Sequence, residues 1–391
     1  MPHDQAHARS SYFGALAPPL TYRTMAQALL QTPSPLLPTQ GAPRQAGWNA
    51  KPPHLAFEAF EGLAPEPDSA EAPVPARALA EQSVFDEITE GLQQHPATIS
   101  PKYFYDQLGS ELFESITRLP EYYPTRTEHA VMQQHAAAIA DAVGHGRTLI
   151  ELGAGNCEKA RTLCRTLAPA CFVGVDISAD FLQDAVARMR EEFPGMDARA
   201  VGADMTRGVT LPADIPRTGR LVFYPGSSIG NFDPPHALML LEQMRDLVDG
   251  EGEPHANGGL LIGIDLPKDV DVLEAAYDDA AGVTAAFNLN VLTHVNRLIG
   301  SNFDPAQWRH LAFFNTLQSR IEMHLQAMSP LQVRWQGGGA RDFAAGECIH
   351  TENSYKYTLP AFTELLARAG FSRAQAWTDP RGWFAVVHAQ P

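Results

Sequence analysis

The chain of 391 residues has little cysteine, and that shortage excludes whole classes of protein. Its four cysteines are too few and too clustered for the disulfide framework of a secreted protein, which favours a reducing compartment. No CxxC pair and no HExxH helix occurs, so we expect no protein-bound metal. A chain of this length can bury a large core without either kind of cross-link.

Basic side chains are also scarce. Lysine and arginine total 29 against 45 acidic residues, a net charge of −16. Nucleic acids and anionic membranes bind clustered basic side chains, so we expect neither as a partner. No apolar run approaches the roughly 20 residues of a membrane-spanning helix, and the first residues lack a basic region followed by an apolar one. We expect a cytoplasmic, monomeric protein that acts on a small molecule.

Residues 1–82 are rich in proline and alanine, a composition that predicts a poorly ordered tail. In residues 83–130, an N-terminal helical and aromatic segment, VFDEITEGLQQ predicts a helix that ends before Pro96. From Thr148 onward, short apolar runs such as TLIELGAG and CFVGVDIS alternate with amphipathic helices such as ADFLQDAVARMREEF. This pattern is typical of βαβ units, so we expect an α/β, Rossmann-like fold with a doubly wound, mostly parallel sheet.

The C-terminal segment departs from that pattern. SRAQAWT and WFAVVHA stand on either side of DPRG, which has proline and glycine where a turn needs them. An antiparallel hairpin that closes an otherwise parallel sheet is typical of class I S-adenosylmethionine-dependent methyltransferases. The stretch before the hairpin is too long for one crossover, so we assign residues 267–357 to an inserted, smaller substrate-binding domain. Residues 83–130 contribute to that domain, and residues 131–266 with 358–391 form the methyltransferase domain.

The segment ELGAGNCEK, residues 151–159, follows a predicted strand and opens a helix. Gly153 and Gly155 would let a ligand approach the backbone there. Glu158 stands where a dinucleotide-binding fingerprint has its third glycine, which disfavours a nicotinamide oxidoreductase and favours S-adenosylmethionine as the cofactor. Lys159 either is a solvated helix residue or binds the carboxylate of the cofactor.

Acidic residues end the next two predicted strands. Asp176 is placed to accept hydrogen bonds from the ribose hydroxyls of the cofactor. Asp204 and Met205 are placed for its adenine.

The segment GSSIGNF, residues 226–232, follows the fourth predicted strand, where methyltransferases of this class place residues that face the methyl group. The amide of Asn231 both donates and accepts, so it could orient the amine and the carboxylate of an amino acid together. The alternative is an ordinary asparagine in a turn after a glycine.

Five segments resemble those of a known family. SPKYFYDQLGSELFESITRLPEYYPTR, ELGAGNCEK, GSSIGNF, AYDDAAGVTAAFNLNVLTHVN and TENSYKY occur in the same order as in the histidine-specific methyltransferases of ergothioneine biosynthesis. The resemblance covers roughly Ser83 to the C-terminus. It implies an L-histidine Nα-methyltransferase that converts L-histidine to its Nα-trimethyl betaine, hercynine, with S-adenosylmethionine.

The resemblance also implies roles for residues that match the motifs of the family. Asn231, Tyr105 and Gly226 would be the catalytic residues. The matching substrate contacts are Tyr105, Phe113 and Tyr122 in an aromatic wall, Gly226 and Asn231 at the amine and carboxylate, Tyr277 at the carboxylate, Glu352 and Ser354 at the imidazole, and Met323 beside them. A neutral imidazole has one N–H donor and one nitrogen acceptor, so a carboxylate with a hydroxyl is a minimal matched pair.

Some alternatives stay open at this point. Asn353 lies between Glu352 and Ser354 and leaves the fine selectivity in doubt, so tryptophan or a modified histidine is an alternative substrate. Glu352 could instead form a surface salt bridge with Lys356. A catalytically silent ligand-binding module is the alternative from another class, although the intact glycine loop and Asn231 speak against it. Tyr103 and Tyr123 are expected in the core.

Overall fold

The computed structural model describes residues 76–249 and 258–391. The expected tail, residues 1–82, lies almost wholly outside these ranges, and only its last residues are seen, in α2 (Ala76–Gln93). This helix begins before the predicted one, because alanine-rich sequence extends it toward the N-terminus, and it ends ahead of Pro96 as predicted. Among the helices within the described ranges, none is both long and apolar enough to cross a membrane.

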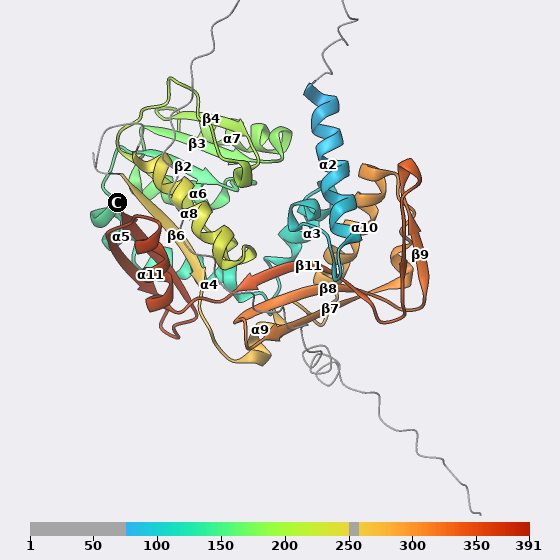
Figure 1. Cartoon of the computed structure of the whole chain (residues 1–391). Coiled ribbons are helices and arrows are strands. Elements are labelled where there is room, and N and C mark those ends of the chain that lie inside the picture. Colours follow the sequence, from blue (N-terminus) through green and yellow to red (C-terminus); the bar gives the residue numbers. More distant parts are fainter. Residues whose placement is uncertain (1–75, 250–257) are drawn as a thin grey trace, which may run out of the picture. The chain divides into compact units, whose positions relative to one another are not determined.

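A seven-stranded sheet contains the strands that the sequence predicts from Thr148 onward (Figure 1). In spatial order the strands are β12 (Arg373–Thr378), β13 (Phe384–Gln390), β6 (Gly259–Asp265), β5 (Arg220–Tyr224), β2 (Thr148–Leu152), β3 (Cys171–Asp176) and β4 (Asp197–Gly202). Neighbours from β6 to β4 are parallel, whereas β13 is antiparallel to both β6 and β12. The predicted parallel sheet with an antiparallel C-terminal hairpin is confirmed.

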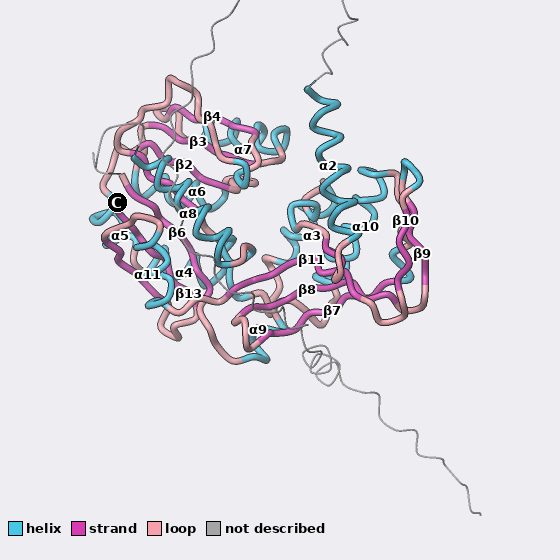
Figure 2. The backbone as a smooth tube through the Cα atoms, in the orientation of Figure 1, coloured by secondary structure: helices cyan, strands magenta, loops and turns pink. Residues whose placement is uncertain are grey.

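Successive strand residues belong to apolar clusters on opposite faces of this sheet, and each cluster includes different helices. Figure 2 traces the helices and strands of this sheet. Leu149 belongs to the apolar cluster of one face, and its neighbour Ile150 to that of the other. The first cluster includes α4 (Tyr123–Gln134), α5 (Ala136–Val143), α6 (Glu158–Leu167) and α7 (Ala179–Glu192), and the second includes α8 (Pro234–Asp249) and α11 (Leu359–Arg368). Because both faces are covered, the strands appear in the sequence as continuous apolar runs.

A second sheet combines segments that precede and follow the first in the chain. Its four strands are, in order, β1 (Ala97–Thr98), β11 (Cys348–Tyr355), β8 (Arg320–Ala327) and β7 (Trp308–Asn315), and a separate pair is formed by β9 (Leu331–Arg334) and β10 (Ala340–Phe343). β1 is parallel to β11, while β11, β8 and β7 are antiparallel neighbours. The sequence did not predict the pairing of β1 with β11.

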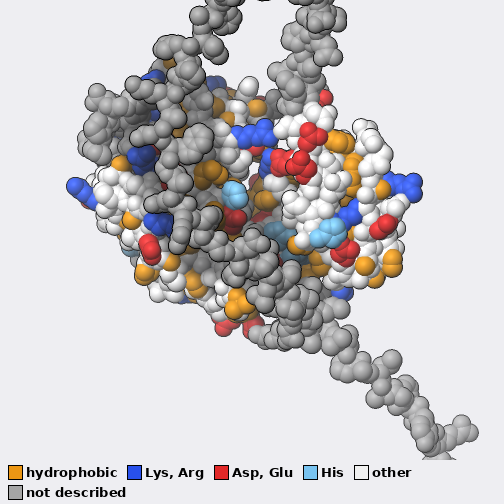
Figure 3. Space-filling model, in the orientation of Figure 1, with side chains coloured by type: hydrophobic (Ala, Val, Ile, Leu, Met, Phe, Trp, Pro, Cys, Tyr) orange, Lys and Arg blue, Asp and Glu red, His pale blue; other side chains and the backbone are white. Residues whose placement is uncertain are grey.

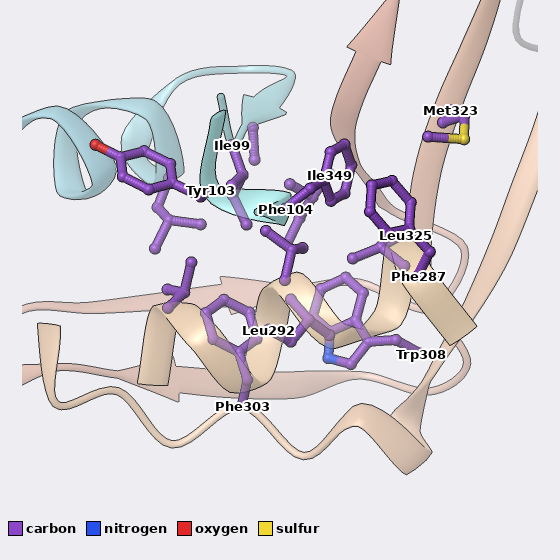
Figure 4. Packing of buried hydrophobic residues seen from close by; sticks show 14 of the residues in the cluster. Ile99, Tyr103, Phe104, Phe287, Leu292, Phe303, Trp308, Met323, Leu325 and Ile349 are labelled. Atoms are coloured by element: carbon purple, nitrogen blue, oxygen red, sulfur yellow. The ribbon is translucent and has the colours of Figure 1, made fainter. Parts of the chain in front are cut away.

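One face of this second sheet forms a core with α10 (Val283–Ile299), η1 (Pro101–Phe104) and α3 (Gln107–Ile116). Figure 4 shows Phe104, Phe287, Leu325 and Ile349 converging there, and the rings of Phe104 and Phe287 are 4.6 Å apart. Tyr103 is buried in the same core, as predicted. Segments that precede and follow the seven-stranded sheet in the sequence thus share one core, which supports the division into domains that we propose.

Charged side chains of both signs lie among one another on the face drawn in Figure 3. Some of the charged side chains form ion pairs, such as Lys102 with Glu87 at 2.7 Å and Arg165 with Glu192 at 2.5 Å. The first of them connects η1 to α2, and it is partly buried.

Candidate active site

The glycine-rich loop after β2 depends on two residues with a left-handed backbone. Gly153 has a φ of 67° and Gly155 a φ of 50°, which residues with a Cβ rarely adopt. The N–H of Gly155 donates to Asp176 Oδ2 over 2.9 Å, and the N–H of Ser178 donates to Asp176 Oδ1. Asp176 stays partly exposed at the end of β3, and a Cβ on Gly155 would meet nothing within 4 Å. The loop therefore leaves room for a nucleoside beside a carboxylate that can accept from ribose hydroxyls.

Asp204 and Met205 lie next to this loop. The Cε atom of Met205 is 3.5 Å from the position of a Cβ built on Gly153. Asp204 accepts from both the N–H and the hydroxyl of Thr206, and its carboxylate is 3.4 Å from Lys102 Nζ. Burial acts to raise the pKa of Asp204, but the Thr206 hydrogen bonds and the Lys102 ammonium outweigh it and lower that pKa. The predicted cofactor contacts thus gather at the carboxyl ends of β2, β3 and β4.

Lys159 and Gly226 are joined by a residue that the sequence did not single out. Lys159 Nζ pairs with Glu128 Oε2 at 2.8 Å, and the N–H of Gly226 donates to Glu128 Oε1 over 2.7 Å. A Cβ on Gly226, where φ is 82°, would stand 2.8 Å from Lys159 Nζ. Glu128 is buried on α4, within a polar stretch that carries no sequence signal for a site. Since the N–H of Gly226 is occupied, only its carbonyl is left for the predicted contact with an amine.

Asn231 ends η3 (Ser228–Asn231), the turn that follows β5. Its side chain makes no hydrogen bond to another described residue, so the turn does not need the amide. Asn231 and Glu352 line the same cavity of about 320 Å³, which α2 and residues 98–101 also border. The lining contains three glutamates and, among the described residues, no lysine or arginine. Such a cavity favours a ligand with cationic or N–H groups.

The predicted aromatic wall is a continuous row of rings. Ring centroids are 5.7 Å apart between Tyr105 and Phe113, 6.3 Å between Phe113 and Tyr122, and 6.3 Å between Tyr122 and Tyr277. All three contacts are edge-to-face, an arrangement that aromatic pairs prefer. Burial, followed by the charge of Glu352, raises the pKa of Tyr105 well above its ordinary value, so this phenol keeps its proton. The row therefore extends from η1 toward the strand that carries Glu352.

Glu352 and Ser354 lie two positions apart on β11, and Met323 on β8 is the cross-strand partner of Glu352. The carboxylate of Glu352 is partly buried and forms no hydrogen bond with another described residue. Burial raises its pKa to about 7, against the opposing effect of Lys356. The oxygen of Ser354 is 2.7 Å from the Tyr277 hydroxyl. Glu352 is thus an acceptor without a partner, beside a hydroxyl pair.

Lys356 does not form the surface salt bridge that was the alternative explanation for Glu352. Its side chain is fully buried, and its Nζ lies 2.8 Å from Asp265 Oδ2 and 2.7 Å from Ser354 Oγ. Lys356 is two positions from Ser354 on the same face of the chain, and Ser354 and Asp265 hold its ammonium in place of Glu352.

Comparisons with known proteins agree with this arrangement. A family model described as histidine-specific methyltransferase, SAM-dependent, matches residues 84–391. The chain belongs to this family. It is therefore an S-adenosylmethionine-dependent methyltransferase, as the sequence resemblance predicts.

The relatives of this family member include well-covered bacterial proteins. A histidine N-alpha-methyltransferase of Mycolicibacterium smegmatis is 41% identical over 78% of this chain and 94% of that protein. The protein of the same description from Mycobacterium tuberculosis is 40% identical, over 77% and 92%. Ergothioneine biosynthesis protein 1 of Neurospora crassa is 27% identical over 72% of this chain but only 32% of that longer protein. Among solved structures, Synechocystis magnesium protoporphyrin IX methyltransferase with bound SAH has a TM-score of 0.39 at 12% identity, covering 74% and 98% of the two chains.

The structure of this family member also contains a buried polar network that the sequence did not indicate. Asp265, at the end of β6, pairs with both Lys356 and Lys268 and accepts from the Tyr123 hydroxyl over 2.5 Å. Burial lowers the pKa of Lys268 to about 8, although Asp265 opposes that shift. Tyr123 is fully buried, as predicted, but its hydroxyl belongs to this network. The position of Asp265 at a strand end, like that of Asp176, is the signal that could have found it.

Glu322, His324 and His350 gather on β8 and β11 with one potential metal-ligating atom each within 4.8 Å of the others. The potential metal-ligating atoms of these three residues already have hydrogen-bond partners, and His350 Nε2 lies 2.9 Å from Asn353 Oδ1. Arg320 and Asn315 donate to Glu322 Oε1, and His324 Nε2 lies 3.0 Å from Glu322 Oε2. Because the Arg320 guanidinium already neutralises the carboxylate, these contacts account for the cluster. The absence of a bound metal stays a prediction.

Proposed function

We propose that this chain transfers methyl groups from S-adenosylmethionine to the α-amine of L-histidine, three times in succession, to form hercynine. The observation that carries the proposal is the unpartnered Glu352 carboxylate, which lines the same cavity as the free Asn231 amide. One group suits the imidazole N–H, and the other suits the amino-acid end of the same ligand. The histidine-directed names of the relatives at 41% and 40% identity support this choice.

The chain's own residues would bind and orient both reactants. The glycine loop and Asp176 would hold the ribose side of the cofactor, with Asp204 and Met205 at the adenine. Asn231 would orient the amine and the carboxylate. The Tyr277 hydroxyl, which the resemblance places at the carboxylate, lies 2.7 Å from Ser354 Oγ and 3.2 Å from Lys356 Nζ, so its proton would stay with Ser354. Lys159 is held by Glu128 at 2.8 Å, so its predicted contact with the cofactor carboxylate would be shared with that pair.

The bound cofactor supplies an electrophilic methyl group on a sulfonium. The amine nitrogen would form the new N–C bond as the C–S bond breaks with its electron pair left on sulfur, and the ammonium would lose one proton to solvent before each of the three rounds. Alignment is the main requirement, because reacting groups held at near-attack distance lose most of their entropic barrier. The α-amine needs only a modest pKa depression to be neutral. Asn231 and Tyr105 would therefore act by positioning.

The aromatic row explains how one site could serve three rounds. The substrate amine gains alkyl groups and ends as a permanent cation, whereas Tyr105 and Tyr122 are electron-rich rings of the aromatic row that extends toward the strand of Glu352. A cationic ammonium group beside such a ring gains about 0.5–2 kcal/mol of cation–π attraction. Partly methylated intermediates would then bind at least as well as histidine.

Selectivity would come from the other end of the substrate. An amino acid without ring nitrogens would leave Glu352 unpaired, at a cost of about 1–3 kcal/mol, which is roughly fivefold to 150-fold in discrimination. Met323, which is 2% exposed beside Glu352, would limit ring size.

Mass spectrometry of products tests the proposal. With S-adenosylmethionine and L-histidine we expect mono-, di- and trimethylated histidine in succession, with fragmentation placing every methyl group on the α-nitrogen. L-Phenylalanine, which lacks ring nitrogens, is the matched negative control. Methylation of the imidazole alone, or preference for tryptophan in a thermal-shift panel, would contradict the proposal.

A further inference from the structure

Lys356 is a buried cation that connects the predicted imidazole-binding residues to the methyltransferase sheet. None of its side chain is exposed, and it forms an ion pair of 2.8 Å with Asp265. The same ammonium donates to Ser354 Oγ over 2.7 Å and to the Tyr277 oxygen over 3.2 Å. An ammonium has three N–H donors, so all are used and none is left for a substrate.

These hydrogen bonds leave one hydroxyl proton for a ligand. An ammonium only donates, so the oxygens of Ser354 and Tyr277 both accept from Lys356. The two hydroxyls carry two protons, and their mutual bond of 2.7 Å uses one. A phenol is a stronger acid than an alcohol, so Tyr277 is the better donor in that bond. Ser354 then accepts from both neighbours, and its own O–H has to point to a third group.

We propose that Lys356 is a positioning residue that makes the Ser354 hydroxyl a donor toward the substrate imidazole. The inference rests on the proposed function, because it places histidine between Glu352 and Ser354. Glu352 accepts the ring N–H while Ser354 donates to the other ring nitrogen, so one neutral tautomer is selected. Without Lys356, Ser354 is free to donate to Tyr277 instead, and the preference for a ring with an acceptor nitrogen is lost.

Asp265 determines where this ammonium stands. It ends β6 with 1% of its surface exposed, and its carboxylate also binds Tyr123 and Lys268, each at 2.5 Å. Its backbone N–H donates to Ser227 Oγ over 2.8 Å, directly before η3. The Lys356–Asp265 pair therefore connects β11 with the turn that carries the amine-orienting amide. The pair thereby fixes the distance between the imidazole-binding end and the amine-binding end of the proposed substrate site.

Lys268 offers a matched control. It pairs with the same Asp265 carboxylate and is also buried, with 2% of its side chain exposed. Its ammonium hydrogen-bonds Tyr123 and the Leu266 carbonyl, but neither Ser354 nor Tyr277. A loss that comes only from disturbing the buried network should appear in Lys268→Met and Lys356→Met alike.

Calorimetric titration tests the inference in the presence of S-adenosylhomocysteine. The ligands are L-histidine and β-(pyrrol-2-yl)alanine, which keeps a ring N–H but lacks the acceptor nitrogen. We expect the wild-type protein to prefer histidine by about tenfold or more. Lys356→Met should reduce that preference to about twofold or less, whereas Lys268→Met should keep it.

The outcomes separate this inference from the proposed function. Wild-type protein that does not bind histidine overturns both. Wild-type protein that binds histidine, with a Lys356→Met variant that weakens both ligands equally, overturns only the role of Lys356. If Lys356→Met does not fold in a thermal melt, Tyr277→Phe decides. This variant removes the other acceptor of the Ser354 proton and leaves Lys356 with Asp265 and Ser354, so the preference for histidine should stay. A preference that falls to about twofold or less in Tyr277→Phe would show that Tyr277, and not Lys356, directs the Ser354 hydroxyl, and would overturn the inference.

Discussion

Glu352 is kept without a partner in the fold, and its titration reflects this. Burial raises its pKa to about 7, with Lys356 opposing. For a group whose pKa is raised on folding, the stabilising form is fully present below the unfolded value of 4.5 and is lost as pH rises through about 7. Ionised Glu352 therefore destabilises the ligand-free fold above neutral pH, while the same charge is what an imidazole N–H needs.

We predict that Glu352→Gln separates stability from binding. At pH 8 and without ligand the variant should unfold about 2 °C above wild type, because its amide does not ionise, and at pH 4.5 the two should unfold together. At pH 8 it should bind histidine about tenfold or more weakly, with unchanged affinity for S-adenosylhomocysteine. Thermal unfolding measures the stability, and calorimetry measures the two affinities.

Glu364→Gln, which changes an exposed glutamate on α11, is the control that should alter neither stability nor binding. Equal loss of affinity for both ligands would remove Glu352 from the imidazole site.

Single residues differ in how well the sequence predicts them. Asp176 and Asn231 follow apolar strands, and the strand pattern alone places them at one edge of the sheet. Glu352 came from a motif resemblance and not from any periodicity. The partnership of Lys356 with Asp265 was missed because it joins two distant segments, and local sequence carries no signal for a buried pair of that kind.

At the scale of elements, the contact between η3 and β11 sets the width of the site. Gly230 in η3 faces the Tyr355 backbone so closely that an added Cβ would stand 2.8 Å from the Tyr355 oxygen and 3.1 Å from its nitrogen. Both atoms belong to the backbone and cannot rotate away. Asn231 comes directly after Gly230 in η3, and Ser354 comes directly before Tyr355 in β11.

We therefore predict that Gly230→Ala pushes the two elements apart and lowers kcat/KM for histidine by about tenfold or more. The affinity for S-adenosylhomocysteine should stay within about twofold, because the glycine loop is untouched. Steady-state kinetics and calorimetry give the two values. Gly195→Ala is the control, since a Cβ there meets nothing within 4 Å. Unchanged kinetics in Gly230→Ala would show that the η3–β11 contact does not set the site.

The elements of the large sheet were easier to predict than those of the small one. Strands such as β2 and β3 are buried on both faces and alternate with helices, a pattern that local sequence shows directly. β1 has only two residues and pairs with β11 from the far end of the chain. Neither length nor composition marks such a strand, because its formation depends on a partner that is close only after folding.

At the scale of the whole molecule, the first described helix begins ahead of the family match. The match begins at residue 84, whereas α2 begins at Ala76. Ile88 and Leu92 of this helix are fully buried in the core of the second sheet, and Glu87 pairs with Lys102 at 2.7 Å. Burying two such apolar side chains stabilises a fold by about 1.5–3 kcal/mol each.

Two truncations should therefore behave differently. A chain that starts at Ala76 should keep its unfolding temperature within about 2 °C and its kcat/KM for histidine within about twofold of the full chain, because no predicted site residue and no described core residue precedes that position. A chain that starts after Gln93 loses α2, and with it one border of the cavity that holds Asn231 and Glu352. It should unfold at a much lower temperature or fail to fold, and lose histidine methylation. Thermal unfolding and the product assay on both chains measure this. Loss of activity in the first truncation would assign residues 1–75 a part in the reaction that the match beginning at residue 84 does not include.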